Sequence, residues 1–178
     1  MNTLISQRIL SPLGDLYVCA SARGVCLLEF VNTQRITRES CQLERHFGCP
    51  ITPGENEHTR QTAAELGEYF AGTRRDFTVA LHPVGSDFRQ RVWAALRAIP
   101  YGTTTHYQAL AANIGHPAAV RAVAAANGAN AIAILIPCHR VIGKDGALTG
   151  YSGGIHRKAW LLAHERGEDK LPTLPLPL

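Results

Sequence analysis

An apolar run that leads into a proline, a thiol and an imidazole constrains the fold of this chain more than any other stretch. Ile134 to Ile136 are uncharged and branched, which predicts burial, and Pro137 ends a regular hydrogen-bond pattern and fixes the direction of the backbone. Cys138 is therefore predicted to be buried and held in place. A buried thiol is usually inert because desolvation disfavours its anion, unless a base or a positive charge lies beside it.

The nearest candidates for such a partner are His139 and Arg140. Adjacent side chains do not face each other on a helix, so a link from His139 to Cys138 requires a sharp turn or a bridging water. From this pattern alone, a buried structural cysteine and a reactive Cys/His pair remain alternatives.

The composition indicates one globular domain or two small ones. The 178 residues are 46% hydrophobic, which is enough for a core. No run approaches the roughly 18 apolar residues of a spanning helix, and Met1 to Ile9 lack a signal-peptide core, so we expect a cytoplasmic protein with no membrane partner. The net charge of +4 allows a polyanionic partner without requiring one.

The first half of the chain has the pattern of an α/β domain. Its apolar positions alternate in short runs or recur at helical spacing, with glycines and prolines between them. The breaker-rich segment 82–85 marks a boundary, which gives a first domain of residues 1–84. The predicted elements are a hairpin of strands 16–20 and 25–30 around the turn 21–24, helices 35–47 and 57–71, and a strand 77–81.

The second half predicts mainly helices. Asp87 with Gln90, and Thr105 with Gln108, form capping-box patterns. The two helices on either side of the turn 115–117 are a helix-turn-helix candidate, although any two packed helices would show this pattern. The alanine-rich second helix could approach another surface closely or pack tightly in a core. The predicted helices are 87–99, 105–114, 118–127 and 155–166.

Four segments together resemble the O6-alkylguanine-DNA alkyltransferases, most closely the stand-alone bacterial form. They are Tyr107–Ala111, Ala119–Val123, Asn130–Ile142 with its Pro-Cys-His-Arg block, and Tyr151–Gly154. The resemblance covers residues 87–165 in one order and the first half more loosely. It implies an α+β fold, with an N-terminal RNase H-like α/β domain followed by a mostly helical winged helix-turn-helix domain of residues 85–170. The turn Lys144–Gly146 would form the wing, and a proline-rich tail, 171–178, would follow.

The resemblance implies a protein that repairs DNA and is consumed by its own reaction. Cys138 matches the cysteine that takes an alkyl group from O6-alkylguanine and keeps it as a thioether, so each molecule would react once. His139 matches the base that removes the thiol proton through water, and Glu165 matches the carboxylate that orients this imidazole. Asn130 matches the asparagine that holds the turn before the active-site segment.

The family also implies how the base is bound. Tyr107 matches the donor to guanine N3, and Ser152 matches the donor to O6. Backbone carbonyls of Cys138 and Val141 would accept from the exocyclic amine, while Tyr151 and Gly153 would line the pocket. Activity on O4-alkylthymine remains open.

The implied partner is double-stranded DNA that contains alkylated guanine. The alanine-rich helix would lie in the minor groove, and the damaged nucleotide would be flipped out of the stack. Arg121 matches the residue that takes its place, and Ala119, Ala122 and Asn127 lie on the same helix. A monomer is expected, with cooperative binding to DNA left open.

No cofactor or metal is expected. Five cysteines without Cys-x-x-Cys spacing indicate neither a disulfide framework nor a zinc knuckle. Some members of the family carry a structural zinc in the N-terminal half, but its ligands cannot be placed on Cys19, Cys26 or His82.

Three other functions are weighed against repair. A non-catalytic lesion sensor would carry tryptophan in place of Cys138. A DNA-binding regulator would need a recognition helix with more polar projections. A cysteine hydrolase would turn over, so the amount of product per protein separates it from a suicide acceptor.

Overall fold

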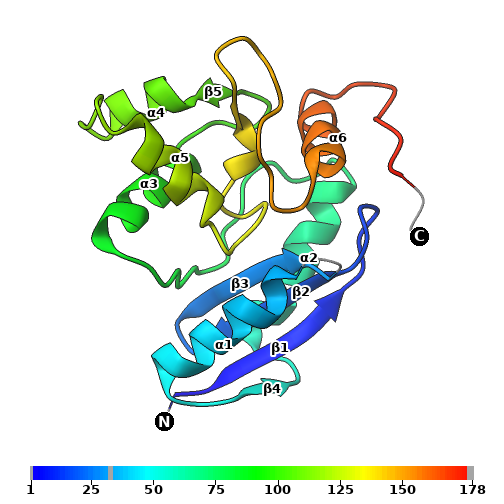
Figure 1. Cartoon of the computed structure of the whole chain (residues 1–178). Helices are drawn as coiled ribbons and strands as arrows, with labels where there is room; N and C mark the ends of the chain where they lie inside the picture. The colour runs from blue at the N-terminus through cyan, green and yellow to red at the C-terminus, as the bar shows by residue number, and fades with distance from the viewer. Residues whose placement is uncertain (1, 32–33, 176–178) are drawn as a thin grey trace. The chain divides into compact units, whose positions relative to one another are not determined.

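The computed structural model describes residues 2–31 and 34–175, which form two compact units (Figure 1). The first unit comprises the residues up to Val84 together with Ala131–Ala133, and the second comprises Gly85–Asn130 and the residues from Ile134 onward. In these described ranges, no helix has the length and apolar character that crossing a bilayer requires.

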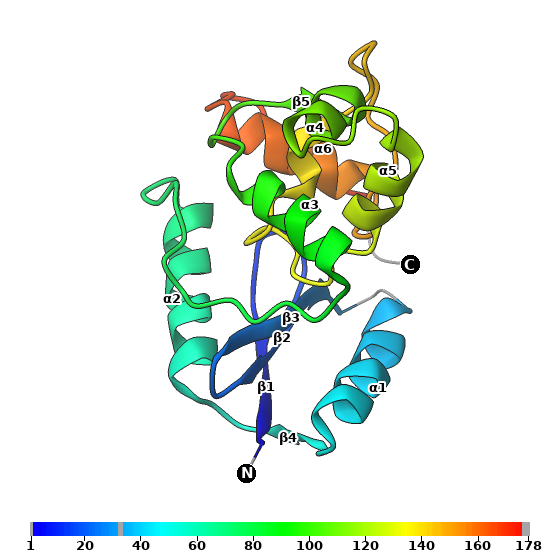
Figure 2. The same cartoon turned by 90° about the vertical axis from the view of Figure 1, so that its left-hand side faces the viewer.

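The first unit is built on a four-stranded sheet with helices on both sides (Figure 2). The strand order is β3-β2-β1-β4, in which β1–β2 and β2–β3 are antiparallel and β4 runs parallel to β1. Every residue of β3 is buried, as expected for a strand covered on both faces. The elements are β1 (Leu4–Ile9), β2 (Leu16–Ser21), β3 (Gly24–Phe30), α1 (Arg35–Phe47), β4 (Ile51–Pro53) and α2 (Glu57–Phe70).

The outer edge of β3 is covered by two short segments from later in the chain. Val25 forms a parallel bridge with Leu81, and Leu28 forms one with Ile132. Leu28 N–H donates to the Ala131 carbonyl at 2.9 Å, and Ala133 N–H donates back to the Leu28 carbonyl at 2.8 Å. These bonds protect an edge that could otherwise pair with another chain. They also place residues 131–133 in the first unit, which the predicted boundaries did not include.

Most local predictions for the first unit are confirmed. The hairpin and both helices are present, and α1 ends at Gly48, whose φ of 66° and N–H bond to the Glu44 carbonyl form a left-handed cap. Strands β1 and β4 were not predicted.

The predicted strand 77–81 is wrong. Of these residues only Leu81 forms a β-bridge, with Val25. The backbone N–H groups that a strand would pair with a neighbour instead donate to the Glu65 carboxylate of α2. Thr78 N–H donates to Glu65 Oε2 at 2.9 Å, and Val79 N–H donates to the same oxygen at 3.3 Å. The segment is therefore fixed by a side chain instead of a neighbouring strand.

The second unit packs three helices around a small apolar core. Trp93 of α3 is buried and donates from Nε1 to the Ala126 carbonyl of α5 at 2.9 Å. Gly85 is required beside this ring, because a Cβ there would lie 2.5 Å from a Trp93 ring carbon. The elements are α3 (Asp87–Arg97), β5 (Thr105–His106), α4 (Tyr107–Asn113), α5 (Val120–Gly128), the 3-10 turn η1 (Cys138–Arg140), β6 (Val141–Ile142) and α6 (Ile155–Glu165).

Several helix starts in the second unit differ from prediction. Ser86, not Asp87, caps α3 by accepting from Arg89 N–H. His106, not Thr105, caps α4, because Thr105 is paired with Val141 in the β5–β6 sheet. Helix α5 begins at Val120 instead of residue 118, after a turn in which Ala119 N–H bonds the His116 carbonyl.

The predicted hairpin wing is also wrong. Strand β6 pairs with β5, and the two run parallel. Residues 143–147 form a closed turn, with Gly143 N–H donating to the Ala147 carbonyl at 2.8 Å, but no strand follows it before α6.

Candidate active site

Cys138 lies at the first residue of η1, directly after Pro137, and is 5% exposed. Asn130 reaches it from the end of α5: its Nδ2 donates to the Ile136 carbonyl at 2.9 Å and to Cys138 Sγ at 3.2 Å. Between them, Ile134 has a φ of 68°, a left-handed conformation that β-branched residues rarely adopt. Asn130 therefore holds an irregular turn closed and places a donor on the sulfur.

His139, Arg140 and Glu165 form a buried ionic cluster beside Cys138. His139 Nε2 lies 2.7 Å from Glu165 Oε1. Arg140 donates to the same carboxylate from two nitrogens. Its Nε lies 2.8 Å from Oε2, and its Nη2 lies 3.0 Å from Oε1. Its third nitrogen donates to the Ile99 carbonyl at 2.7 Å. The segment after Cys138 is thus bound to α6 and to the end of α3.

This cluster fixes the protonation states of its members. Burial of Glu165 alone would raise its pKa, but its bonds and charge interactions with His139 and Arg140 outweigh burial and hold the pKa well below its usual range. Burial lowers the pKa of His139, although Glu165 opposes this shift. An ionised Glu165 accepts from Nε2–H, so the neutral imidazole carries its lone pair on Nδ1. Among residues 2–31 and 34–175, that Nδ1 has no hydrogen-bond partner.

Lys158 adds a buried cation to the same region. Its side chain is fully buried, and Nζ donates to the Val141 carbonyl at 2.6 Å and to the Thr149 carbonyl at 2.7 Å. Burial lowers the pKa of Lys158, and attraction to Cys138 acts in the opposite direction. Lys158 therefore ties the 143–154 loop to β6 and favours negative charge on the Cys138 sulfur.

Two models of 6-O-methylguanine DNA methyltransferase match the chain, the ribonuclease-like domain over residues 7–83 and the DNA binding domain over residues 87–167. This chain belongs to the 6-O-methylguanine DNA methyltransferase family. The predicted α+β fold, with a ribonuclease-like domain before a helical DNA-binding domain, is thereby confirmed.

Several proteins of this family are similar in sequence to this chain over most of its length. A "Methylated-DNA--protein-cysteine methyltransferase" of Salmonella typhimurium is 42% identical over 168 residues, which are 93% of this chain and 97% of the relative. The crystal structure of Mycobacterium tuberculosis OGT in complex with DNA is 41% identical, with a TM-score of 0.79, and the match covers 92% of this chain and 93% of that one. The M. tuberculosis O6-methylguanine methyltransferase structure is 41% identical, with a TM-score of 0.77 and 96% coverage of both chains.

The predicted substrate-binding residues of this family member lie on segments that the structure ties to Cys138. Pairing of β5 with β6 places Thr105 and His106 beside Val141 and Ile142, so Tyr107, the next residue, begins α4 near the end of η1. The Val141 carbonyl, the predicted acceptor for the base, accepts from Lys158 Nζ at 2.6 Å.

Tyr151, Ser152 and Gly153 lie in the loop before α6. Tyr151 and Ser152 are half-buried, and Gly153 is buried. Gly154 N–H bonds the Tyr151 carbonyl, and Arg157 Nη1 donates to the Gly153 carbonyl at 3.0 Å. These bonds give the predicted pocket loop a defined shape.

The four predicted DNA-binding residues differ in exposure. Arg121 and Ala122 are exposed on α5, and Ala119, just before the helix, is half-buried. Asn127 is only 4% exposed, so it does not project from α5, and its Oδ1 has no partner within the described part of the chain. A surface contact through Asn127 requires a change from this arrangement.

The sequence indicated no role for Lys158, and it indicated Arg140 only as a possible positive charge beside Cys138, not as a partner of Glu165. For Lys158 a signal was present: Lys158, Leu161 and Glu165 are spaced so that they lie on one face of a helix. Two ionisable residues on an otherwise apolar stripe indicate buried polar contacts. Nothing comparable in the sequence marks Arg140 as the partner of Glu165.

The residues of the N-terminal unit do not fit a structural zinc. In residues 2–31 and 34–175, no three His, Cys, Asp or Glu side chains are grouped so that they could hold a metal ion. Burial raises the pKa of the Cys19 thiol to about 12, which disfavours the thiolate that zinc needs. His82 Nδ1 is already bonded to Ser21 Oγ at 2.8 Å.

Proposed function

We propose that this chain repairs DNA by transferring the alkyl group of O6-alkylguanine to its own Cys138, once per molecule. The observation that carries the proposal is the environment of that sulfur. It accepts from the Asn130 amide and is followed at once by a histidine whose Nε2 is held by a buried carboxylate. The relatives named as methylated-DNA–protein-cysteine methyltransferases support the same reaction.

The reaction proceeds as a single displacement. His139 Nδ1 takes the thiol proton through a bridging water, and the sulfur attacks the alkyl carbon. A carbon–sulfur bond forms while the carbon–O6 bond breaks, and its electron pair leaves with guanine. Donors from Tyr107 and Ser152 stabilise the charge that develops on the base. The thioether has no route back to the thiol, so the protein is consumed.

Two residues keep the base and the nucleophile ready for this step. Arg140 holds Glu165 ionised and in place, and Glu165 fixes the His139 tautomer that leaves Nδ1 as the proton acceptor. Lys158 supplies positive charge near the sulfur without touching the substrate, so we assign it a positioning role.

DNA is the partner of this family's DNA-binding domain. We further propose that the alkylated nucleotide is flipped from the minor-groove side, that Arg121 fills its place, and that the protein acts as a monomer in the cytoplasm. Replacing Arg121 with alanine should slow repair of duplex DNA more than reaction with free alkylated base, because only the duplex requires extrusion. Equal slowing of both reactions would contradict the role of Arg121, and Arg60→Ala on the exposed face of α2 is the control.

The central test is a single-turnover labelling experiment. The protein is mixed with duplex DNA that carries labelled O6-methylguanine, and the label is located by peptide mass. We expect one label per molecule, on Cys138, and none in Cys138→Ser. Cys41→Ser, which removes an exposed thiol, should leave the labelling unchanged. Label on another residue, or more than one product per protein, would refute the proposal.

A further inference from the structure

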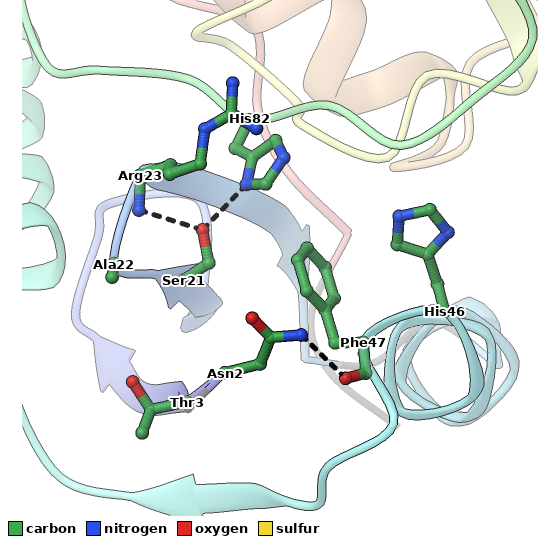
Figure 3. Close-up of a pocket in the computed structure, with 8 residues that line it drawn as sticks. All are labelled: Asn2, Thr3, Ser21, Ala22, Arg23, His46, Phe47 and His82. Carbon is green, nitrogen blue, oxygen red and sulfur yellow. Dashed lines mark hydrogen bonds between the residues drawn. The ribbon is translucent and has the colours of Figure 1, made fainter.

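The first unit contains a cavity that the proposed repair reaction does not use (Figure 3). It has a volume of about 270 Å³ and lies between the β2–β3 turn, the end of α1 and the segment after residue 81. Its lining residues are Asn2, Thr3, Ser21, Ala22, Arg23, His46, Phe47 and His82.

Two imidazoles flank an aromatic ring in this cavity (Figure 3). The Phe47 ring meets His46 edge-on at a centroid distance of 4.9 Å and His82 edge-on at 5.3 Å. Ser21 Oγ bonds His82 Nδ1 at 2.8 Å, which fixes this ring and leaves Nε2 for a second partner. Asn2 Nδ2 donates to the Phe47 carbonyl at 3.0 Å and so holds the end of α1 against the start of the chain. The polar groups are thus supported by bonds to the surrounding fold.

The charge of the lining is uniformly positive or neutral. Arg23, His46 and His82 are its titratable groups, and none of the eight lining residues is a carboxylate. From α2, His58 approaches the same turn, bonding the Ala22 carbonyl at 3.1 Å and lying 3.4 Å from Glu57 Oε1, but neither side chain lines the cavity. Burial lowers the pKa of His82, and the charges of Arg23 and His46 lower it further. A metal cation would meet the same repulsion, whereas an anion would relieve it.

We propose that this cavity binds a phosphate group, held by His82 and His46 with Arg23 as a further counter-charge. The volume accommodates a tetrahedral oxyanion with some of its water. Ser21 fixes the orientation of the His82 ring, so the protonated imidazole offers Nε2–H at a set position, and protonated imidazoles form strong charge-assisted bonds to phosphate oxygens. The phosphate could be free or part of a nucleic-acid strand. The site is separate from Cys138, so its failure would leave the repair proposal intact.

The test follows the histidine ring signals of the full-length protein by NMR while inorganic phosphate is added. We expect saturable shifts of the His46 and His82 signals, because a bound anion favours the protonated rings. Binding should therefore be tighter at pH 6 than at pH 8. His82→Gln should weaken binding roughly tenfold, the usual effect of losing a hydrogen bond between charged groups. His116→Gln, in the second unit, should leave it unchanged.

Titrations with undamaged duplex DNA and with Zn²⁺ distinguish free phosphate from backbone phosphate and an anion from a metal ion. If undamaged duplex DNA moves the same signals and inorganic phosphate displaces it, the site takes backbone phosphate; if only inorganic phosphate acts, it takes the free ion. Should His82→Gln fold poorly, Arg23→Gln in the exposed turn replaces it, with weaker binding again expected. The proposal is overturned if phosphate shifts all exposed histidines alike, if neither variant weakens binding, or if Zn²⁺ binds there in preference.

Discussion

Cys19 and Cys138 are both buried, but the residues around them differ. Cys19 is fully buried in β2 within an apolar cluster that includes Leu4, Leu27 and Leu43, and burial, with smaller effects from Cys26 and Cys49, raises its pKa to about 12. Cys138 is 5% exposed but accepts from the Asn130 amide and attracts buried Lys158. Polar neighbours, not exposure, are therefore what separates the proposed acceptor thiol from a thiol packed in an apolar core.

The backbone explains why only one of them has such neighbours. Cys19 lies in a strand that is paired on both sides, with a register shift against β3 between Cys19 and Ala20, and its side chain packs among apolar residues. Cys138 follows a proline and a strained Ile134, in a turn where carbonyls and side chains from α5 and α6 converge. The turn after α5 is what brings the Asn130 amide to this sulfur.

Thiol alkylation gives the largest expected contrast. With iodoacetamide at pH 8, Cys19 should react roughly a thousandfold more slowly than exposed Cys41, because a pKa of about 12 leaves very little thiolate. Mass spectrometry of peptides from the native protein measures both rates. If Cys19 in the folded protein were labelled at a rate close to that of Cys41, burial would not make its thiol inert. In denaturant, where burial is lost, Cys19 should be labelled rapidly.

Glu165→Gln should have the next largest effect, on both the stability of the protein and the rate of alkyl transfer. It leaves Arg140 without a buried counter-charge, which costs about 3–5 kcal/mol of unfolding free energy. It also weakens the base, so alkyl transfer should slow roughly a hundredfold. Denaturant unfolding and single-turnover repair measure the two effects. Glu168→Gln, which removes an exposed partner of Arg166, is the matched control and should change stability by less than about 0.5 kcal/mol.

The same variant tests the pH dependence of stability. The pKa of Glu165 is lower in the folded protein than in the unfolded chain, where it is about 4.3. Its contribution is therefore complete above about pH 5 and is lost as pH falls through the unfolded value toward the folded pKa. Unfolding free energy measured from pH 7 to pH 3 should fall less steeply in Glu165→Gln. An identical slope would show that Glu165 is not held ionised by its partners.

Patterns that depend on neighbouring residues could be read from the sequence. The period of apolar residues and Gly48 predicted α1 with its correct end, and α2 was predicted to within a residue. The Pro137–Cys138 step predicted a fixed, buried thiol. The resemblance also named Asn130, His139 and Glu165, which the structure brings together around Cys138, while their roles in transfer stay predictions.

What the sequence did not predict depends on distant partners. The alternation of 77–81 suited a strand, but Glu65 offers its backbone a carboxylate instead. Residues 131–133 join the edge of β3 across about a hundred positions of sequence, and no local pattern records such a pairing. Lys158 looks like an ordinary surface charge until its buried partners are known, and the position of Arg140 next to His139 does not indicate its ion pair with Glu165.

Lys158→Met should have a smaller effect than Glu165→Gln. It keeps the packing of the side chain but removes the cation near Cys138, so transfer at pH 7 should slow roughly tenfold. Because the sulfur loses electrostatic support for its anion, the pH–rate profile should move to higher pH. A purely structural role would lower the rate equally at every pH. Lys170→Met, at an exposed position after α6, is the control and should leave the profile unchanged.

Glu65→Gln should have the smallest effect, and it should leave repair untouched. Glu65 binds neutral donors, Thr78 and Val79 N–H among them, so glutamine keeps one acceptor and loses about 1–2 kcal/mol of unfolding free energy. Its pKa is lowered by these hydrogen bonds against the effect of burial, so part of the loss should disappear at pH 3. Unfolding and single-turnover repair are measured side by side. Among the residues that the structure describes, Glu65 bonds only groups of the first unit, Gln61 and Thr78 among them, whereas Glu165 is proposed to support the base, so slowed repair in Glu65→Gln would contradict this distinction.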